Sequence, residues 1–148
     1  MFQGAVDIGQ GSNTVISQIC ADAIGLSIDQ FDLVYGDTDL TADAGKTSAS
    51  RQTFVSGKAA YLAGRALRDK LLAIAKVSDS AELRLNGNTL VTTDASIDSS
   101  IALDQLSADK DGFVARAEGT FDPPTMPLDE NGQGEPYASF GYGAQMVE

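Results

Sequence analysis

The feature that constrains the fold most is a long helical pattern from about residue 50 to residue 76. Apolar side chains recur there at the spacing of one helix face, and Gly57 and Gly64 interrupt the pattern. Glycine lowers helix stability by about 1 kcal/mol relative to alanine. We therefore expect a neighbouring element to pack closely against the two glycines. The apolar stripe consists of Phe54, Leu62, Ala66, Leu67 and Leu71.

A strand, a glycine turn and a helix are predicted before the long helix. Residues 2–8 alternate loosely like a strand and run into the turn Gly9-Gln10-Gly11. Ser12 then offers an N-cap, and helical spacing continues to Gly25. A second strand is predicted over residues 31–35, and the loop over residues 36–48 is long enough to suggest a function. This order predicts a βαβ start.

After the long helix the pattern changes to short strands. The sequence Asn86-Gly87-Asn88 separates two predicted strands, residues 82–85 and 89–93, and is a strong hairpin signal. The remaining expectations are a short helix at about residues 98–105, a strand at 112–121 and a final strand at 137–147. Together these elements predict the α+β class, with helices packed on one face of a mixed sheet and a central β-hairpin. We expect residues 1–148 to form a single domain.

Charge and residue types exclude several classes of protein. The net charge of -11 at pH 7 argues against a nucleic-acid partner. The sequence has no histidine and one cysteine, Cys20, which we expect to be buried, so no zinc site, iron–sulfur cluster or Ser-His-Asp triad is predicted. No metal ligand is assigned. The sequence also lacks an apolar run of about 20 residues and an N-terminal signal peptide, which predicts a soluble, cytoplasmic protein without a membrane span.

Common nucleotide and cation motifs are present only in part. Thr14 stands where the dinucleotide fingerprint requires its third glycine, and Leu40 stands where a phosphate loop requires its first. The Asp37-Thr38-Asp39 stretch lacks the glycine and the final glutamate of a calcium loop, because Ala42 and Ser48 occupy those positions. These three motifs therefore assign no site.

Two glycine- or serine-rich segments, residues 9–14 and 47–52, each lead into a predicted helix start. Such starts present free N–H groups and the positive end of the helix dipole. If the two parallel strands are neighbours, both starts lie at one edge of the sheet, where Lys46 and Arg51 would face an anion. An equally open interpretation is that the serines at these starts, Ser12, Ser48 and Ser50, only cap the helices.

Three stretches of the chain carry a family resemblance. They are residues 6–14 around Gly9-Gln10-Gly11, residues 47–52, and the run 134–148. Residues 57–61 in the long helix add to the match. Together these stretches resemble the molybdenum-cofactor-binding subunit of the xanthine dehydrogenase and aldehyde oxidase family, the molybdenum hydroxylases. The resemblance covers essentially the whole chain.

The resemblance implies a cofactor, an activity and partners. The family binds molybdopterin, the molybdenum cofactor, and hydroxylates aldehydes or N-heterocycles with an oxygen derived from water. Electrons then pass to [2Fe-2S] clusters and often FAD, which are expected on partner domains or on iron–sulfur and flavin subunits. By the same resemblance Gln10 and Gly11 contact the pterin. The residues implied to line its pyrophosphate or dithiolene side are Ser48, Ala49, Ser50, Arg51 and Gln52.

Departures from the family limit what this chain is expected to do alone. The family's catalytic glutamate lies downstream of residue 148, a glycine- and phenylalanine-rich loop lies upstream of residue 1, and neither Glu135 nor Glu148 matches the catalytic position. No catalytic residue is assigned, and the chain is expected to be an inactive part of a larger molybdopterin-binding domain. The alternative is a stand-alone small-anion or nucleotide-binding module without redox chemistry. The sequence does not identify the small-molecule substrate.

Overall fold

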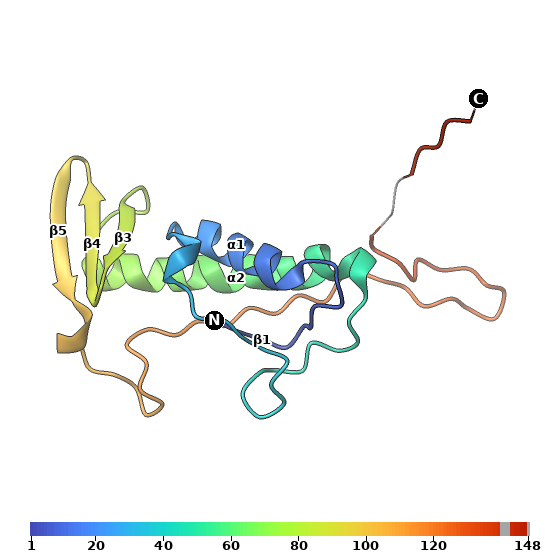
Figure 1. The fold of residues 1–148 in the computed structure, drawn as a ribbon, viewed down its shortest axis with the longest axis horizontal. Helices are drawn as coiled ribbons and strands as arrows, with labels where there is room; N and C mark the ends of the chain where they lie inside the picture. The colour runs from blue at the N-terminus through green and yellow to red at the C-terminus, as the bar shows by residue number, and fades with distance from the viewer. Residues whose placement is uncertain (140–142, 148) are drawn as a thin grey trace.

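Two helices lying side by side form the centre of the protein in the computed structural model, which describes residues 1–139 and 143–147 (Figure 1). They are α1 (Ser12–Ile24) and α2 (Ala49–Ala75). A Cβ atom built on Gly64 would lie 2.7 Å from Ala23 Cβ and 2.8 Å from the Cys20 carbonyl oxygen. One built on Gly57 would lie 2.8 Å from Ile19 Cδ1. The prediction that a neighbour packs against both glycines is confirmed.

The two helices run parallel. Ile19 meets Gly57, and Ala23, further along α1, meets Gly64, further along α2. Both helices therefore begin at the same end of the molecule, on the right in Figure 1.

A short parallel sheet confirms the βαβ start. Strand β1 (Phe2–Gln3) pairs with β2 (Val34–Tyr35), and Phe2 lies opposite Val34. Both strands are shorter than the predicted ranges. Pairing ends because the chain meets other partners after β1: a Cβ on Gly4 would lie 1.9 Å from the Ala42 carbonyl oxygen, so this backbone packs against the 36–48 loop instead of a strand.

A second, separate sheet contains the predicted hairpin. Strands β3 (Glu82–Asn86), β4 (Thr89–Asp94) and β5 (Ile97–Ala102) are antiparallel, in that order. The α+β class is confirmed, but parallel and antiparallel pairing occur in two sheets and not in the single mixed sheet expected. The predicted helix at 98–105 is wrong over β5, because those residues pair with β4; only the 3-10 turn η2 (Leu103–Gln105) is helical.

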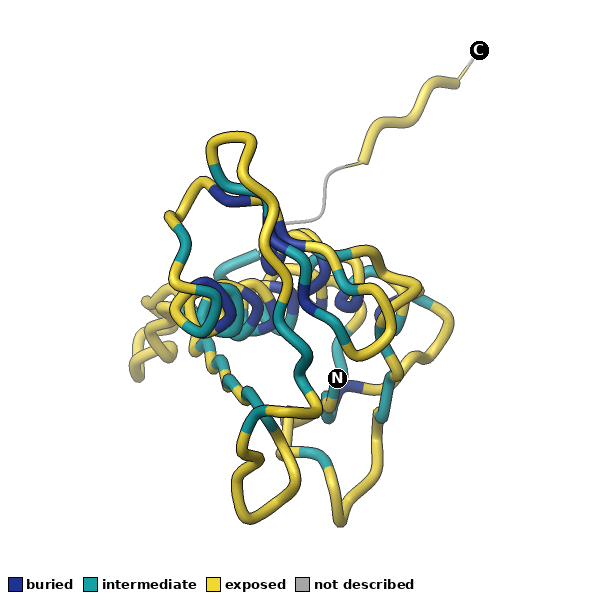
Figure 2. Tube along the Cα trace, turned by 90° about the vertical axis from the view of Figure 1, so that its left-hand side faces the viewer, coloured by how far each residue is buried: buried dark blue, intermediate teal, exposed yellow. Residues whose placement is uncertain are grey.

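The core lies where α1, α2 and the second sheet meet. Figure 2 shows the buried residues gathered along these elements, while most of the loops are exposed. Cys20 is buried, as predicted, and Leu67 is partly buried against the core. The buried apolar cluster includes Ile16, Ile24, Leu71, Leu72, Leu83 and Leu90.

One guanidinium ties the helix pair to the chain that leads into the second sheet. Arg68 Nη1 donates to the Ile24 carbonyl oxygen at the end of α1, at 2.8 Å. Its Nη2 donates to the carbonyl oxygens of Asp79, at 3.2 Å, and Ala81, at 2.7 Å. Arg68 thus joins three segments through carbonyls that helix and sheet pairing leave free.

The predicted strand at 112–121 is wrong, because this segment pairs with no strand among the described residues. It lies instead along α2 and runs toward the start of that helix. Arg116 accepts a hydrogen bond from Lys70 through its carbonyl oxygen, and Phe121 packs edge to face on Phe54 with ring centroids 5.5 Å apart. Between these contacts the backbone of Gly119 lies directly against α2, since a Cβ atom built on Gly119 would lie 2.3 Å from the Ala59 carbonyl oxygen.

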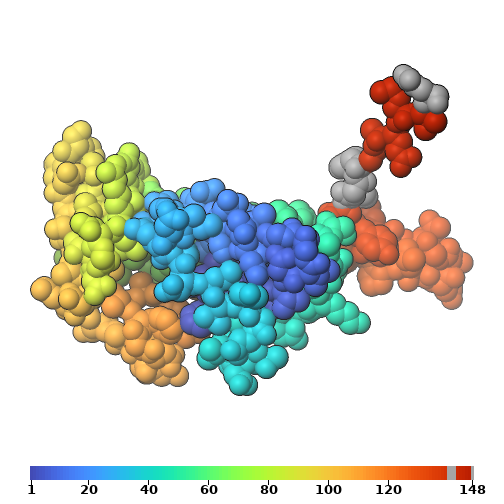
Figure 3. All heavy atoms as spheres, in the orientation of Figure 1, coloured from blue at the N-terminus to red at the C-terminus, as the bar shows by residue number. Residues whose placement is uncertain are grey.

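The predicted final strand is also absent from residues 137–139 and 143–147, and residues 140–142 lie outside the described part of the chain. Residues 143–147 project away from the body of the molecule (Figure 3). In the described ranges, no helix combines the length and apolar character that crossing a membrane requires.

Asp94 supplies a test of stability against pH. Its carboxylate accepts hydrogen bonds from the Ser78 backbone N–H and hydroxyl, both at 2.8 Å. These bonds, the backbone one foremost, lower the pKa of Asp94 from its ordinary value of 3.8. A lowered pKa means that the stabilisation is complete above pH 3.8 and is lost as the pH falls through the native value. Asp94→Asn is expected to flatten the acid limb of the stability curve measured by urea unfolding; an unchanged limb would contradict this role.

Candidate functional site

The two segments singled out in the sequence come together at the shared end of the helices. Because Ser12 precedes Ile19 by as many residues as Ser50 precedes Gly57, and helices rise about 1.5 Å per residue, the two starts lie at the same level. Helices packed in contact have axes about 8–10 Å apart. The Val6 N–H also donates to Thr47 Oγ1 at 3.3 Å, which joins the chain just before each start. We call residues 9–13 and 47–52 the paired helix starts.

The turn before α1 is held by the side chain of Gln10. Its Nε2 donates to the Val6 carbonyl oxygen at 3.1 Å and to Ser12 Oγ at 3.2 Å, while its Oε1 accepts from the Ile8 N–H at 2.6 Å. Gly9 and Gly11 have φ angles of 107° and 74°, which disfavour other residues. Since a Cβ at either would meet nothing within 4 Å, the turn presents bare backbone to open space.

Asp7 is a residue of this turn that the sequence interpretation missed. Its carboxylate accepts hydrogen bonds from the backbone N–H groups of Gly9 at 2.8 Å, Gly11 at 3.4 Å and Asn13 at 3.5 Å. The bond from Gly9 is the main cause that lowers the pKa of Asp7, and the bonds from Asn13, Gly11 and Ser12 add to it. An aspartate two residues before a glycine is a recognised turn signal, which would have pointed to this position.

The start of α2 has the opposite character. Its N-cap residue Ser48 has extended backbone, and its side chain makes no capping hydrogen bond within the described structure. The first turn carries no acidic residue. Arg51 and Lys46 are both exposed, and the Arg51 Nη2 donates to the Lys46 carbonyl oxygen at 3.5 Å. This helix start is therefore basic and open, whereas the start of α1 already holds a carboxylate.

The predicted cofactor-binding residues differ in their exposure. Ala49 and Ser50 are exposed on the first turn of α2, whereas Gln52 is buried and donates through Nε2 to Ser56 Oγ. The interpretation that serines only cap the helices is not supported, because the N-cap of α1 is Gly11 and not Ser12, and the side chain of Ser48, the N-cap residue of α2, makes no capping hydrogen bond in the described part of the chain.

The chemistry of these groups fits an anionic, polar cofactor. Backbone N–H groups at a helix start, serine hydroxyls and a guanidinium are the donors that proteins use for phosphate. The ring edges of a pterin need neutral donors and acceptors and close backbone approach, which the glycine turn before α1 provides. In residues 1–139 and 143–147, no group of three His, Cys, Asp or Glu side chains is arranged to hold a metal ion.

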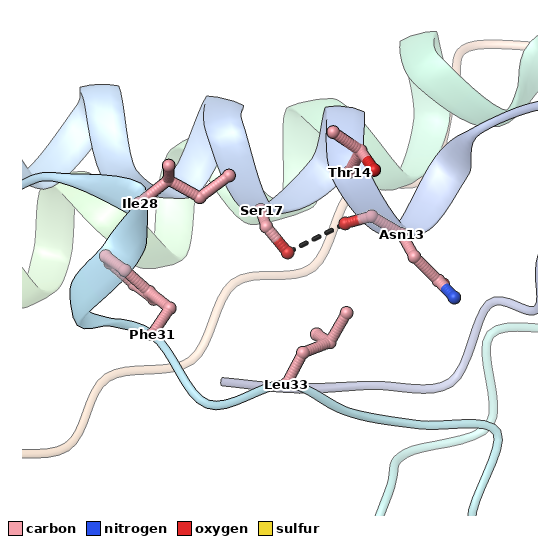
Figure 4. A pocket seen from close by; sticks show the side chains of 6 residues that line it. All are labelled: Asn13, Thr14, Ser17, Ile28, Phe31 and Leu33. Carbon is pink, nitrogen blue, oxygen red and sulfur yellow. Dashed lines mark hydrogen bonds between the residues drawn. The ribbon is translucent and has the colours of Figure 1, made fainter.

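A groove of about 220 Å³ runs beside the first turns of α1 (Figure 4). The apolar side of the groove is formed by Ile28, Phe31 and Leu33. On the opposite side, the Ser17 hydroxyl donates to the Asn13 carbonyl oxygen at 2.7 Å. The remaining lining residue is Thr14, and the lining includes no charged residue. The groove thus lacks the charges of an anion site.

Comparison with known proteins agrees with this chemistry. The chain is 31% identical over 129 residues to the 6-hydroxypseudooxynicotine dehydrogenase complex subunit gamma of Paenarthrobacter nicotinovorans, covering 85% of this chain and 16% of that protein. It is 37% identical over 75 residues to a putative xanthine dehydrogenase molybdenum-binding subunit of Escherichia coli (strain K12), covering 50% and 10%. It is 33% identical over 100 residues to a nicotinate dehydrogenase subunit of Pseudomonas putida, covering 60% and 8%.

The chain spans no more than about a sixth of the length of these three relatives. A family model described as the molybdopterin cofactor-binding domain matches residues 1–148 in full. The family resemblance stated from the sequence is thereby confirmed, and molybdopterin is the cofactor of the family. The chain belongs to the molybdopterin cofactor-binding domain family.

Proposed function

We propose that this chain forms one part of the molybdopterin cradle of a molybdenum hydroxylase, and that the paired helix starts hold the cofactor. The observation that carries the proposal is the parallel packing of α1 and α2, which brings residues 9–13 and 47–52 to one end of the molecule. Neither helix start alone would indicate a ligand. Together they offer a neutral glycine turn beside a basic, uncapped helix start.

Within this cradle, the backbone of Gln10 and Gly11 contacts the pterin, and residues 48–52 face its phosphate side. The turn is fixed before the cofactor arrives, because the Gln10 side chain already uses its amide to hold Val6, Ile8 and Ser12. Arg51 neutralises phosphate charge at the start of α2. The buried side chain of Gln52 supports this site indirectly, because its hydrogen bond to Ser56 Oγ stabilises the first turns of α2. When bound, the cofactor supplies the metal-centred redox chemistry, and the protein supplies position and charge.

The complete enzyme is proposed to hydroxylate an N-heterocycle or an aldehyde with oxygen from water. The names of the relatives support the first class, since nicotinate and xanthine are N-heterocycles. Further proposals are that this chain works inside a larger molybdenum subunit, with [2Fe-2S] and FAD on partner domains or subunits, and is inactive by itself. Cytoplasmic location stays a prediction from the sequence.

Arg51 provides the direct test of the cradle. In the complete molybdenum subunit, Arg51→Ala is expected to weaken cofactor retention about 10- to 150-fold, because a hydrogen bond to a charged group contributes roughly 1.5–3 kcal/mol. Molybdenum analysis and pterin fluorescence, both per mole of protein after dialysis, measure retention. Arg65→Ala is the matched control, since Arg65 is exposed further along the same helix.

Equal cofactor content in the Arg51 and Arg65 variants would contradict the proposed phosphate contact. A complete protein that carries no molybdopterin but binds a nucleotide tightly would favour the alternative function, a small-anion or nucleotide-binding module.

A further inference from the structure

We propose that Asp7 is a positioning residue that acts as a built-in anion: it occupies the start of α1, fixes the Gln10 turn and excludes a second anion from it. The inference rests on the proposed function and deepens it. It assigns opposite tasks to the paired helix starts, because the turn before α1 is reserved for a neutral part of the ligand. Only the start of α2 remains for a negatively charged group.

The geometry of the carboxylate supports this role. Asp7 Oδ1 accepts from the N–H groups of Gly9 at 2.8 Å and Gly11 at 3.4 Å, and Oδ2 accepts from Asn13 at 3.5 Å. Gly9 lies in the turn before α1, whereas Gly11 is the N-cap of the helix and Asn13 lies in its first turn. Backbone N–H groups of a glycine turn and of the helix start that follows it are the donors that a phosphate or carboxylate ligand uses. The shortest bond holds Gly9, a residue with φ of 107°, so Asp7 also fixes the backbone on both sides of Gln10.

The negative charge of Asp7 makes the turn before α1 selective against anionic ligand groups. The pKa of Asp7 is lowered by the Gly9 hydrogen bond foremost, so the carboxyl is ionised at neutral pH. A second anion at the same donors would meet a like charge at hydrogen-bonding distance, which is unfavourable. The amide of Gln10 and the hydroxyl of Ser12 are uncharged and are bonded to each other, and so are the amides of Gln3 and Asn13 beside them. A neutral, hydrogen-bonding ring edge faces no such repulsion.

The start of α2 shows what a helix start without a built-in anion looks like. It carries no acidic residue in its first turn, and Lys46 and Arg51 stand beside it. Because the two starts lie at one level and are joined by Val6 and Thr47, the difference in charge between them sets the orientation of a ligand that reaches both.

The experiment uses sodium pyrophosphate as the probe at constant ionic strength, followed by amide chemical shifts in ¹⁵N-labelled chain. Asp7→Asn keeps the size of the side chain and removes its charge. Asp22→Asn is the matched control, because it removes the same charge from an exposed position on α1. Asp7→Ser is a second variant that leaves a short acceptor in place should the asparagine disturb the turn.

In wild type and in the Asp22 variant, pyrophosphate is expected to shift the amides of residues 49–51 more than those of Gly9, Gly11 and Asn13. In the Asp7 variants, the apparent Kd measured at those three turn amides should fall by about two- to fivefold, the range expected for removing one like charge at a helix start.

Two results would overturn the inference: turn amides that respond in wild type as strongly as residues 49–51, or an Asp7 variant whose turn amides bind no tighter than those of the Asp22 variant. The proposed function fails separately. If residues 49–51 do not respond in any protein, the proposed phosphate contact at α2 is wrong, and the role of Asp7 is then decided by whether the turn amides bind pyrophosphate more tightly in the Asp7 variants than in the Asp22 variant.

Discussion

Replacing Arg68 by alanine is expected to lower the free energy of unfolding by about 2–4 kcal/mol. The variant loses three hydrogen bonds from one charged group, to the carbonyl oxygens of Ile24, Asp79 and Ala81. A single hydrogen bond from a charged group contributes roughly 1.5–3 kcal/mol, and three that share one guanidinium do not add fully. Urea unfolding followed by circular dichroism measures the loss.

Two variants separate this bridging role from the general effect of losing a cation on α2. Arg65→Ala removes an exposed arginine from the same helix and is expected to change stability by less than about 0.5 kcal/mol. Arg68→Lys keeps the charge but cannot span three carbonyls in a planar fork, so an intermediate loss is expected. If the Arg65 and Arg68 alanine variants unfold alike, the bridge does not stabilise the fold.

Replacing Gly64 by valine is expected to destabilise the protein by about 3 kcal/mol, at the upper end of the usual cost of overpacking. The first added carbon would lie 2.7 Å from Ala23 Cβ and 2.8 Å from the Cys20 carbonyl oxygen. Backbone cannot move aside as the end of a side chain can, so α1 must shift away from α2. The shift would also separate the paired helix starts, so cofactor content in the complete subunit is expected to fall with stability.

Gly57→Ala is the matched control for this packing prediction. Here the added carbon meets Ile19 Cδ1 at 2.8 Å, the end of a flexible side chain. Alanine also gains about 1 kcal/mol in helix propensity over glycine. The control is therefore expected to be neutral or slightly stabilising in the same urea titration. A Gly64→Val variant as stable as the control would show that the helices are not in close contact there.

Sequence patterns predicted the parts of this fold that depend on neighbours along the chain. The helix from Ser12 to the glycine stop at Gly25 matches α1, and the Asn86-Gly87 turn lies between β3 and β4 as expected. These features depend on local backbone preferences and on periodicity.

Features that depend on distant partners were misread. Residues 98–102 contain Asp98, Ser99 and Ser100, which have low strand propensity, yet they form β5 because β4 pairs with them, and Thr92 and Thr93 add side-chain hydrogen bonds. Residues 112–121 alternate like a strand, but they lie on α2, and alternation indicates an extended chain without identifying what it packs against.

The candidate site also combines features that the sequence predicts with features that depend on distant contacts. Spacing placed Gln10 and residues 47–52 at helix starts, and the parallel packing that joins them follows from Gly57 and Gly64. The family resemblance implied that Gln10 and Gly11 contact the pterin and that residues 48–52 line its pyrophosphate or dithiolene side, but the helix starts by themselves predicted the same preference for an anion at both. The role of Asp7 was missed because its position relative to three backbone N–H groups is set by the left-handed turn at Gly9 and Gly11.

The length of α2 has a consequence for how this domain can vary. Its 27 residues span about 40 Å, with the paired helix starts at one end and the antiparallel sheet at the other (Figure 1). Changes to the strands and turns of that sheet therefore occur a helix length away from the two segments proposed to hold the cofactor. The loops at the sheet end of the domain can therefore change in length or sequence without displacing the paired helix starts.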